Sequence, residues 1–194
     1  LNGFTMTVKG DLYQPEGSMM INGGVLNIEG DYLRYTEEKN LQTGEVEKRG
    51  SNGYLKMNTI EDTVIVGGDY VTYVPDTGYS GLSDELYVGQ LIVQGNFHHL
   101  GGDLDFGENC SLIFDGIECP ELSMEADLKN NRDTIKLSHV EFKTGKVVFK
   151  GEMIGFSLQQ DLEVVGDFPI FSGGFDLNGF TMTVKGDLYQ PEGS

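Results

Sequence analysis

The fold is decided by the stretch Asn2-Gly-Phe-Thr-Met-Thr-Val-Lys-Gly-Asp-Leu12, which aligns without a gap on Asn22-Gly-Gly-Val-Leu-Asn-Ile-Glu-Gly-Asp-Tyr32. In both stretches, apolar and polar residues alternate before a Gly-Asp pair. Such alternation over four or five residues indicates a strand with one buried face, and Gly followed by Asp favours a turn. The pattern predicts a short strand that ends in a fixed turn and returns about 20 residues later.

Looser copies of this ending, an apolar-x-apolar run and then Gly with Asp, Asn or Glu, recur at Asp69, Asn96, Glu152, Asp167 and Asp187. Asn-Gly precedes the strands and does not join two alternating runs, which is a poor match to a two-residue hairpin loop. We therefore expect each strand to stack parallel on its counterpart in the preceding rung. The sequence predicts an all-β fold, a right-handed parallel β-helix (β-solenoid) with rungs of about 20 residues and loop excursions.

Stacking at a strand spacing of about 4.8 Å would place Met6 over Leu26 and Val8 over Ile28. On the outer face Lys9 would lie beside Glu29, and we expect Lys9, Glu29 and Lys185 to be exposed. The predicted core columns consist of Met6, Val8, Leu26, Ile28, Val64, Val66, Leu91, Val93, Val147, Phe149, Leu162, Val164, Met182 and Val184.

The spacing of the rungs is irregular in the middle of the chain. The polar stretch 37–49 is predicted to be an insertion between Asp31 and Asp69, and Thr72 to Asp84 a second loop. The stretch from Asn109 to His139 lacks the Gly-Asp ending, although its alternation still indicates strands. Because no linker marks a boundary, residues 1–194 are expected to form one elongated domain.

Residues 177–194 repeat residues 1–18 letter for letter, 176 residues later. Perfect identity indicates a tandem array of nearly identical units, or an engineered duplication, so the chain consists of one 176-residue repeat and an 18-residue overlap. The ends of a solenoid present unpaired backbone groups to another chain. We therefore expect head-to-tail association with adjacent repeats or subunits. Each repeat should contain about nine rungs and rise by about 40 Å along the axis.

Composition excludes several classes of partner. The chain has 13 basic and 31 acidic residues and a net charge of −18, which repels nucleic acid and anionic membranes. No apolar run approaches the roughly 20 residues that a membrane span needs, so membrane insertion is not expected. Cys110 and Cys119 match no zinc pattern, and the sequence leaves open whether they form a local disulfide or remain two thiols.

The acids of the predicted turns form the one candidate site. If the rungs stack, Asp11, Asp31, Asp69, Asp167 and Asp187 form a column together with Asn96 and Glu152. Neighbouring like charges repel unless turn N–H groups or cations neutralise them. The column therefore predicts either turn capping or weak calcium binding, which would raise thermal stability in millimolar divalent cations. No other cofactor is expected.

Catalysis is not predicted. Paired carboxylates serve glycoside hydrolysis, but 31 acids in 194 residues produce close pairs by chance. The pairs in question are Asp84-Glu85, Asp103 with Asp105, and Glu118, Glu121 and Glu125. His98-His99 is expected on an exposed loop, and His139 on the face of a strand.

The rung openings and the Gly-Asp endings resemble the tandem repeat regions of filamentous-haemagglutinin-like adhesins of bacteria. The resemblance covers Met19–Tyr32, Gly53–Tyr70, Glu85–Phe97 and Phe175–Gln190. It implies a right-handed β-helix that serves as an extracellular stalk, fibre or adhesin shaft at the cell surface, without catalytic residues.

The alternative function is a glycan-binding module that uses exposed aromatic residues on loops, such as Tyr73, Tyr79 and Phe97, together with His98. Aromatic side chains gathered on one flat face would favour glycan binding. Aromatic side chains that are scattered or buried would favour the shaft.

Overall fold

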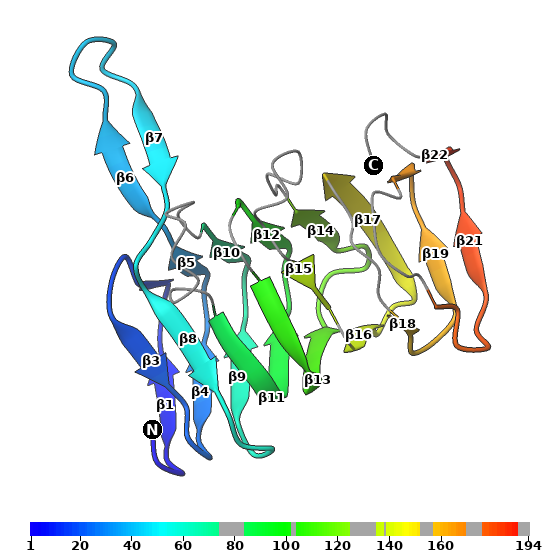
Figure 1. Ribbon diagram of the computed structural model, residues 1–194, viewed down its shortest axis with the longest axis horizontal. Coiled ribbons are helices and arrows are strands. Elements are labelled where there is room, and N and C mark those ends of the chain that lie inside the picture. Colours follow the sequence, from blue (N-terminus) through cyan, green and yellow to red (C-terminus); the bar gives the residue numbers. More distant parts are fainter. Residues whose placement is uncertain are drawn as a thin grey trace.

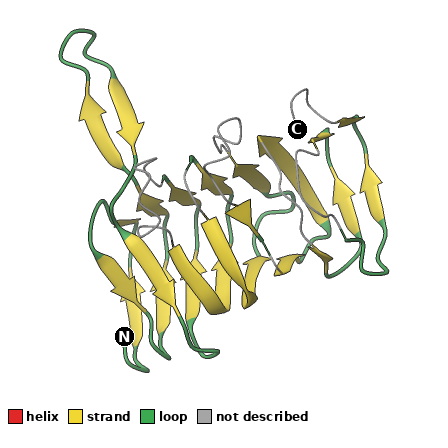
Figure 2. Ribbon diagram, in the orientation of Figure 1, coloured by secondary structure: helices red, strands yellow, loops and turns green. Residues whose placement is uncertain are grey.

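The computed structural model describes residues 1–73, 84–101, 104–124, 135–137, 139–151, 157–169 and 176–189. Every regular element in these ranges is a β-strand, and none is a helix (Figure 2). In the described ranges no helix is long and apolar enough to cross a membrane. The prediction of an all-β fold is confirmed.

Most strands belong to two long parallel sheets. The first sheet contains β1 (Thr5–Val8), β4 (Val25–Ile28), β9 (Thr63–Val66), β11 (Asp84–Val93), β13 (Leu104–Phe114), β16 (His139–Phe142) and β18 (Ser157–Leu158), with β3 (Ser18–Met20), β8 (Tyr54–Met57) and β15 (Ile135–Lys136) beside them. The second sheet contains β2 (Leu12–Tyr13), β5 (Tyr32–Arg34), β10 (Tyr70–Thr72), β12 (Phe97–His99), β14 (Glu121–Met124), β17 (Lys146–Gly151), β19 (Leu162–Val164) and β21 (Met182–Val184).

The chain passes from one sheet to the other, and most inner strands pair with a strand from the preceding and the following pass (Figure 1). A third, two-stranded parallel pair joins β20 (Phe168–Pro169) to β22 (Leu188–Tyr189). This stacked parallel arrangement fits a β-solenoid, because every pass buries its apolar face against its neighbours.

The predicted register is confirmed at the first two passes. Met6 pairs with Leu26, Val8 pairs with Ile28, and Lys9 forms an ion pair with Glu29. The 20-residue offset holds at the two ends of the stack, whereas the steps between corresponding turns in the middle are 38, 27 and 25 residues. The eight strands of the second sheet make seven steps in the described part of the chain, fewer than the nine rungs expected, because insertions lengthen the inner passes.

The core lies between the sheets, where side chains of successive passes form columns. Tyr70 meets Tyr32 edge-on and stacks on Phe97, with ring centroids 5.1 and 5.0 Å apart. Further along the chain, the tilted rings of Phe149 and Phe168 are also 5.0 Å apart. Aromatic pairs at such distances contribute beyond their buried area. The predicted core residues on the inner passes are buried: Leu26, Ile28, Val64, Val66, Leu91, Val93, Val147, Phe149, Leu162 and Val164.

The prediction of burial is wrong for the four core residues at the two ends. Met6 is 39% exposed, and Val8, Met182 and Val184 are only partly buried. Their strands have a neighbour on one side only among the described strands, so half of each column contact is missing. The predicted exposure of Lys9, Glu29 and Lys185 is confirmed.

The predicted insertion at 37–49 forms an antiparallel hairpin of β6 (Thr36–Lys39) and β7 (Val46–Arg49), which projects from the stack. Arg49 lies 3.2 Å from the Glu38 carboxylate and 2.7 Å from that of Glu47. The strands predicted between Asn109 and His139 are present as β13 to β16. Of the second predicted loop, residues 74–83 lie outside the described residues.

Cys110 and Cys119 are both free thiols, so the disulfide alternative is wrong. Cys110 is part of the buried core, and burial raises the pKa of its thiol to about 12. A thiol in such surroundings is unreactive.

Candidate functional site

The acid of each Gly-Asp turn caps the next turn along the stack. Asp11 Oδ1 accepts a hydrogen bond from the Asp31 backbone N–H at 2.8 Å, and Asp31 Oδ1 accepts one from that of Asp69 at 2.8 Å. Asp69 Oδ1 accepts from the Asn96 N–H at 2.7 Å, and Asn96 Oδ1 accepts from the Glu121 N–H at 2.9 Å. We call this series the acid ladder. Each carboxylate in it faces a backbone donor, which offsets the repulsion between neighbours.

Four of the five predicted metal candidates, Asp11, Asp31, Asp69 and Asp167, accept such a bond, and the fifth, Asp187, takes part through its backbone N–H. At the far end Asp167 Oδ1 accepts from the Asp187 backbone N–H at 2.8 Å. Within the described residues no three His, Cys, Asp or Glu side chains lie close enough to hold a metal ion. The geometry supports turn capping, while weak calcium binding stays a prediction. Glu152, which was expected in the same column, lies outside the described residues.

The glycine that precedes each acid leaves room for the ladder. A Cβ on Gly95 would lie 2.4 Å from Asp69 Oδ1 and 2.6 Å from the carbonyl oxygen of Gly68. A Cβ on Gly186 would lie 2.3 Å from an oxygen of the Asp167 carboxylate, whereas at Gly10 no described atom lies within 4 Å. Gly10 and Gly186 occupy the same position of the duplicated segment. Among the described residues, therefore, packing requires glycine at position 186 but not at position 10.

The two copies of the duplicated segment fold in the same way. Asn2 and Asn178 have positive φ angles of 53° and 48°, and Gly3 and Gly179 both have 81°. In each copy a short first strand, β1 or β21, is followed by a two-residue strand, β2 or β22. We call residues 1–13 the first coil and residues 177–189 the last coil.

The two coils pair with neighbours on opposite sides. The first coil pairs through β1 and β2 with residues 25–33, and the last coil pairs through β21 and β22 with residues 162–169. Lys9 bonds Glu29, whereas its equivalent Lys185 lies 3.2 Å from the Glu163 carboxylate. The same coil sequence is thus paired on one side in the first copy and on the other side in the last copy.

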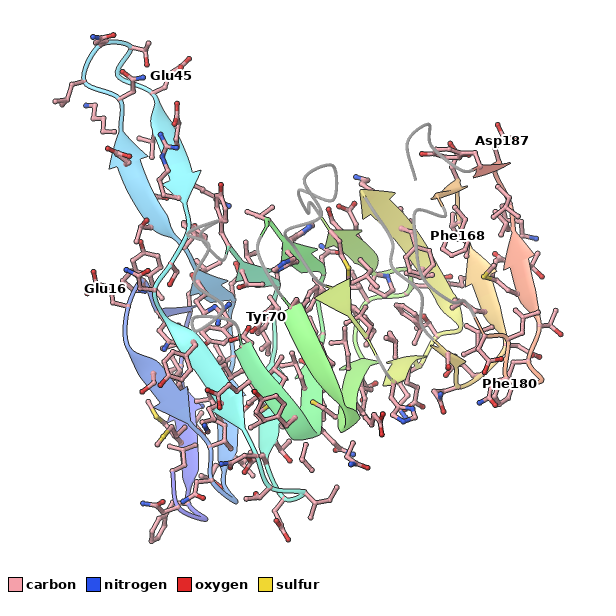
Figure 3. The ribbon with its side chains drawn as sticks, viewed as in Figure 1. Glu16, Glu45, Tyr70, Phe168, Phe180 and Asp187 are labelled. Atoms are coloured by element: carbon pink, nitrogen blue, oxygen red, sulfur yellow. The ribbon has the colours of Figure 1, made fainter. Side chains whose placement is uncertain are left out.

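Both coils expose large apolar side chains among their polar residues. Figure 3 shows Phe180 and Asp187 at one end of the stack, away from the core position of Tyr70. The exposed large apolar side chains of the two coils are Phe4, Met6, Tyr13, Leu177, Phe180, Leu188 and Tyr189. The strands of both coils have a paired neighbour on one side only among the described strands.

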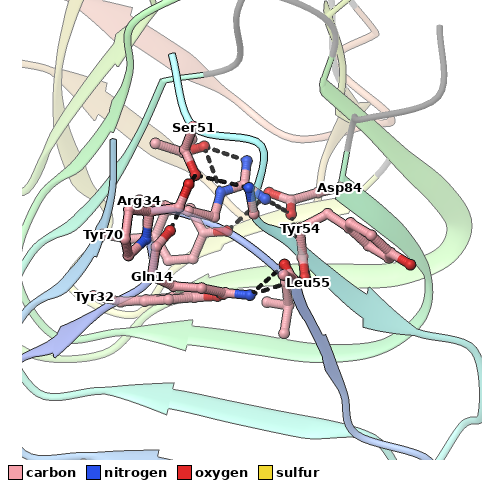
Figure 4. Close-up of polar contacts among 12 residues, drawn as sticks. Gln14, Tyr32, Arg34, Ser51, Tyr54, Leu55, Tyr70 and Asp84 are labelled. Atoms are coloured by element: carbon pink, nitrogen blue, oxygen red, sulfur yellow. Dashed lines mark hydrogen bonds and ion pairs between the residues drawn. The ribbon is translucent and has the colours of Figure 1, made fainter. Parts of the chain in front are cut away.

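A buried polar cluster lies inside the stack (Figure 4). Arg34 and Asp84 form an ion pair with fully buried side chains, and Arg34 Nε donates to Thr72 Oγ1 at 3.1 Å. Asp84 also accepts from the Leu55 N–H at 2.7 Å and from the Tyr70 hydroxyl at 3.0 Å. Burial and the negative charge of Asp84 raise the pKa of Tyr70 well above its usual value. For Arg34, burial lowers the pKa, but Asp84 outweighs this effect and the net shift is upward.

The same region holds the root of the projecting hairpin. The Tyr32 hydroxyl donates to Gln14, whose Nε2 donates to the Gly17 carbonyl at 2.9 Å. Ser51, just after the hairpin, donates from Oγ to the Pro15 carbonyl at 2.7 Å. Sequence reasoning missed Arg34 and considered Asp84 only as a member of a carboxylate pair. The available signal is alternation, since Arg34 follows the inward-facing Tyr32 by two residues.

The described carboxylates among those considered for catalysis are held in separate ion pairs. Asp84 is held by Arg34, and the glutamates of the same candidate set pair with lysines. These pairs are Glu85 with Lys56, Glu118 with Lys146, and Glu121 with Lys150. Asp103, the Asp105 side chain and Glu125 lie outside the described residues. Glu85 with Lys56 and Glu121 with Lys150 are opposite charges on neighbouring strands.

The prediction of an exposed His98-His99 loop is wrong. Both residues belong to β12, where His99 is buried and His98 lies 3.7 Å from the Glu121 carboxylate. The alternation of a strand explains the burial of His99, because His99 lies two residues after the buried Phe97 and faces the same side. His139 lies on a strand face as predicted and borders a shallow hollow of about 260 Å³, together with Ser111, Glu141 and Gln159.

The aromatic residues proposed for glycan contact do not share one exposed face. Phe97 is buried, Tyr73 is half-buried, and Tyr79 lies outside the described residues. The described aromatic rings between the sheets pack against one another, face to face in two pairs and edge-on or tilted in the others. This distribution supports the shaft more than the glycan-binding alternative.

Comparison of the chain with protein-family models, with curated proteins and with solved structures finds no match. The coils and the acid ladder are therefore the features of the molecule that bear on its function.

Proposed function

We propose that the chain is a structural repeat module of an extracellular filament or adhesin shaft at the cell surface. In this proposal the repeats form one continuous right-handed parallel β-solenoid, and the partner of each module is the next copy of itself. The module has no catalytic role. The net charge of −18 supports solubility of such a repetitive β protein and disfavours nucleic acid as a partner.

The observation that carries the proposal is that the duplicated coil has complementary neighbours on its two sides. Met182 pairs with Leu162, and its equivalent Met6 pairs with Leu26. In a tandem array one methionine would lie between both leucines, and the following valine would lie between Val164 and Ile28.

The charges of the same coil are also complementary on both sides. The lysine at position 9 or 185 would lie between Glu29 of one unit and Glu163 of the other. Opposite charges on neighbouring strands stabilise a sheet by roughly 0.2–1 kcal/mol per pair. The acid ladder would continue too, with Asp167, the shared aspartate and Asp31 in sequence.

The mechanism of the shaft is mechanical. No single pass can bury its own apolar face, so stability comes from neighbouring passes. A shared junction coil would complete the columns that are half open at Met6 and Val8. Seven steps of about 4.8 Å give each repeat a rise of about 34 Å, and one hairpin projects per repeat.

Small-angle X-ray scattering tests the proposal with the present chain and a chain that carries one further 176-residue unit. The longer chain should gain about 34 Å in maximum dimension at an unchanged cross-section radius. A matched control carries Val184→Asp, at the junction of the two units in the longer chain, which places a charge in the core column. We expect this control to lose the regular increase in length.

Two results would contradict the proposal. One is an increase in cross-section without a corresponding increase in length, which would show side-by-side packing of the units. The other is the scattering curve of two compact particles joined by a flexible linker, with no difference between the longer chain and its Val184→Asp control.

A further inference from the structure

The first coil is not built to stack on another first coil. The turn from Leu1 to Phe4 and the turn from Ile21 to Gly24 are equivalent, since Phe4 N–H donates to the Leu1 carbonyl at 3.2 Å and Gly24 N–H donates to the Ile21 carbonyl at 3.3 Å. Phe4 therefore stands in the first coil at the place that Gly24 has in the next one. The same place in the last coil is taken by Phe180.

The coil that lies on the first coil needs glycine at this place. A Cβ on Gly24 would lie 2.6 Å from the Phe4 carbonyl oxygen and 2.7 Å from the Leu1 Cβ. If the first coil of one chain lay on the last coil of another, Phe4 would take the place of Gly24. Its Cβ would then meet the backbone oxygen of Phe180, which cannot move away without distorting the turn.

Charge also opposes such coil-on-coil stacking. The first coil places Lys9 beside Glu29 of the following coil. In coil-on-coil stacking Lys185 of one chain would instead lie beside Lys9 of the other, and like charges on neighbouring strands are destabilising.

The last coil of one chain fits a different place in a second chain. It has the sequence and the turn conformation of the first coil, so it can make every contact that the first coil makes with residues 22–33. We infer that separate chains join by coil exchange, in which residues 177–189 of one chain replace residues 1–13 of the next. This inference rests on the proposed shaft function and names how its subunits connect.

The energetics of exchange favour this route. The contacts that the receiving chain loses are replaced by identical contacts, and the incoming coil becomes covered on both sides. The displaced residues 1–18 regain conformational freedom. The first coil has a neighbour on one side only among the described strands, and such end elements open at low free energy. Because donor and acceptor are opposite ends, the contact does not close and builds linear filaments.

Disulfide trapping between two full-length variants tests the inference. Thr7 lies beside Asn27 in the register of β1 and β4, and Thr183 is the equivalent of Thr7. Exchange therefore places Thr183 of one chain beside Asn27 of another, about 4.8 Å away between Cα atoms, which a disulfide can span. A mixture of Asn27→Cys and Thr183→Cys chains should give a cross-linked dimer on mild oxidation. All variants carry Cys119→Ser, and Cys110 is buried.

A second cysteine pair reports on coil-on-coil stacking, the rival arrangement. Coil-on-coil stacking would place Thr183 of one chain beside Thr7 of another, so Thr7→Cys mixed with Thr183→Cys reports on it. Each single-cysteine chain alone gives the background. We expect the Asn27/Thr183 mixture to exceed this background severalfold and the Thr7/Thr183 mixture to remain near it.

Two further variants change the yield in opposite directions. Val8→Asp in the Asn27→Cys chain weakens the coil that must leave, so cross-linking should rise severalfold. Val184→Asp in the Thr183→Cys chain weakens the coil that must enter, so cross-linking should fall to background. A melting curve of each variant verifies that the inner passes remain folded.

Cross-linking of Thr7 with Thr183 above that of Asn27 with Thr183 would overturn coil exchange. Background levels for both pairs at millimolar protein would overturn it as well. Either result leaves the scattering experiment on the longer chain intact, so failure of exchange and failure of the shaft are distinguishable.

Discussion

Asp31 Oδ1 accepts a hydrogen bond from the backbone N–H of Asp69 at 2.8 Å, although the two residues are 38 positions apart. The same bond recurs with separations of 20, 27 and 25 residues at other turns. The ladder therefore keeps the turns aligned while the length of chain between them varies. This tolerance allows the hairpin of β6 and β7 to be inserted without breaking the stack.

Replacing Asp31 by Ala should lower the free energy of unfolding by about 1–2 kcal/mol, because the Asp69 N–H loses its acceptor. Asp31→Asn is the matched control and should be nearly neutral, since Asn96 makes the same contact with its amide oxygen. Urea unfolding monitored by circular dichroism measures both. Equal losses for the two variants would contradict the capping role, as would a melting temperature of the wild type that calcium raises and a chelator lowers.

Glycine at the turn should be essential in the inner passes and dispensable in the first coil. Gly95→Ala should destabilise the protein by about 1–3 kcal/mol, because the new methyl group meets the Gly68 carbonyl and the Asp69 carboxylate. Gly10→Ala should change stability by less than about 0.5 kcal/mol, as is usual for surface substitutions. Thermal unfolding distinguishes the two, and a similar loss at both positions would be inconsistent with the ladder geometry.

Removal of the buried cation should be far more damaging than removal of an exposed one. Arg34→Ala leaves the Asp84 charge buried without its partner and should reduce stability by about 3–5 kcal/mol. Arg49→Ala removes two exposed ion pairs in the hairpin and should lose no more than about 1 kcal/mol. Chemical denaturation of both variants gives the comparison. A small loss of stability for Arg34→Ala would mean that the buried ion pair contributes little to the stability of the fold.

Stability should fall in acid in a manner that depends on Asp62. Burial raises the pKa of this carboxyl, but hydrogen bonds from Thr59 and from the backbone N–H groups of Gly23, Thr59 and Asn58 outweigh it, so the pKa lies below its usual value. Because the folded-state pKa is depressed, the stabilisation is present above about pH 4 and is lost as pH falls through the folded-state value. Asp62→Asn should therefore flatten the stability profile below about pH 4, and an unchanged acid limb would rule out this contribution.

The sequence predicted the parts of the fold that depend on local pattern. Alternation and the Gly-Asp ending were sufficient to pair Met6 with Leu26 and Lys9 with Glu29. They also placed the aspartates of the turns in one column, because the turn sets the phase of each strand.

The parts that depend on distant contacts were not predictable in the same way. Arg34 and Asp84 are 50 residues apart, and nothing local indicates that one neutralises the other. Met6 has the pattern of a core residue but is exposed, because burial in a solenoid depends on the number of neighbouring passes and not on the strand alone. His99 was placed on an exposed loop because the His-His pair is polar. The better guide is its position two residues after Phe97, which puts both side chains on the same face of the strand.

The axial repeat of a long array tests the central claim, that stacking continues without interruption across repeat boundaries. Electron cryomicroscopy of a chain with several 176-residue units should show straight rods whose power spectrum has a strand reflection near 4.8 Å and an axial repeat of about 34 Å. Rods broken into separate beads, or an axial repeat that is not close to seven strand spacings, would contradict it.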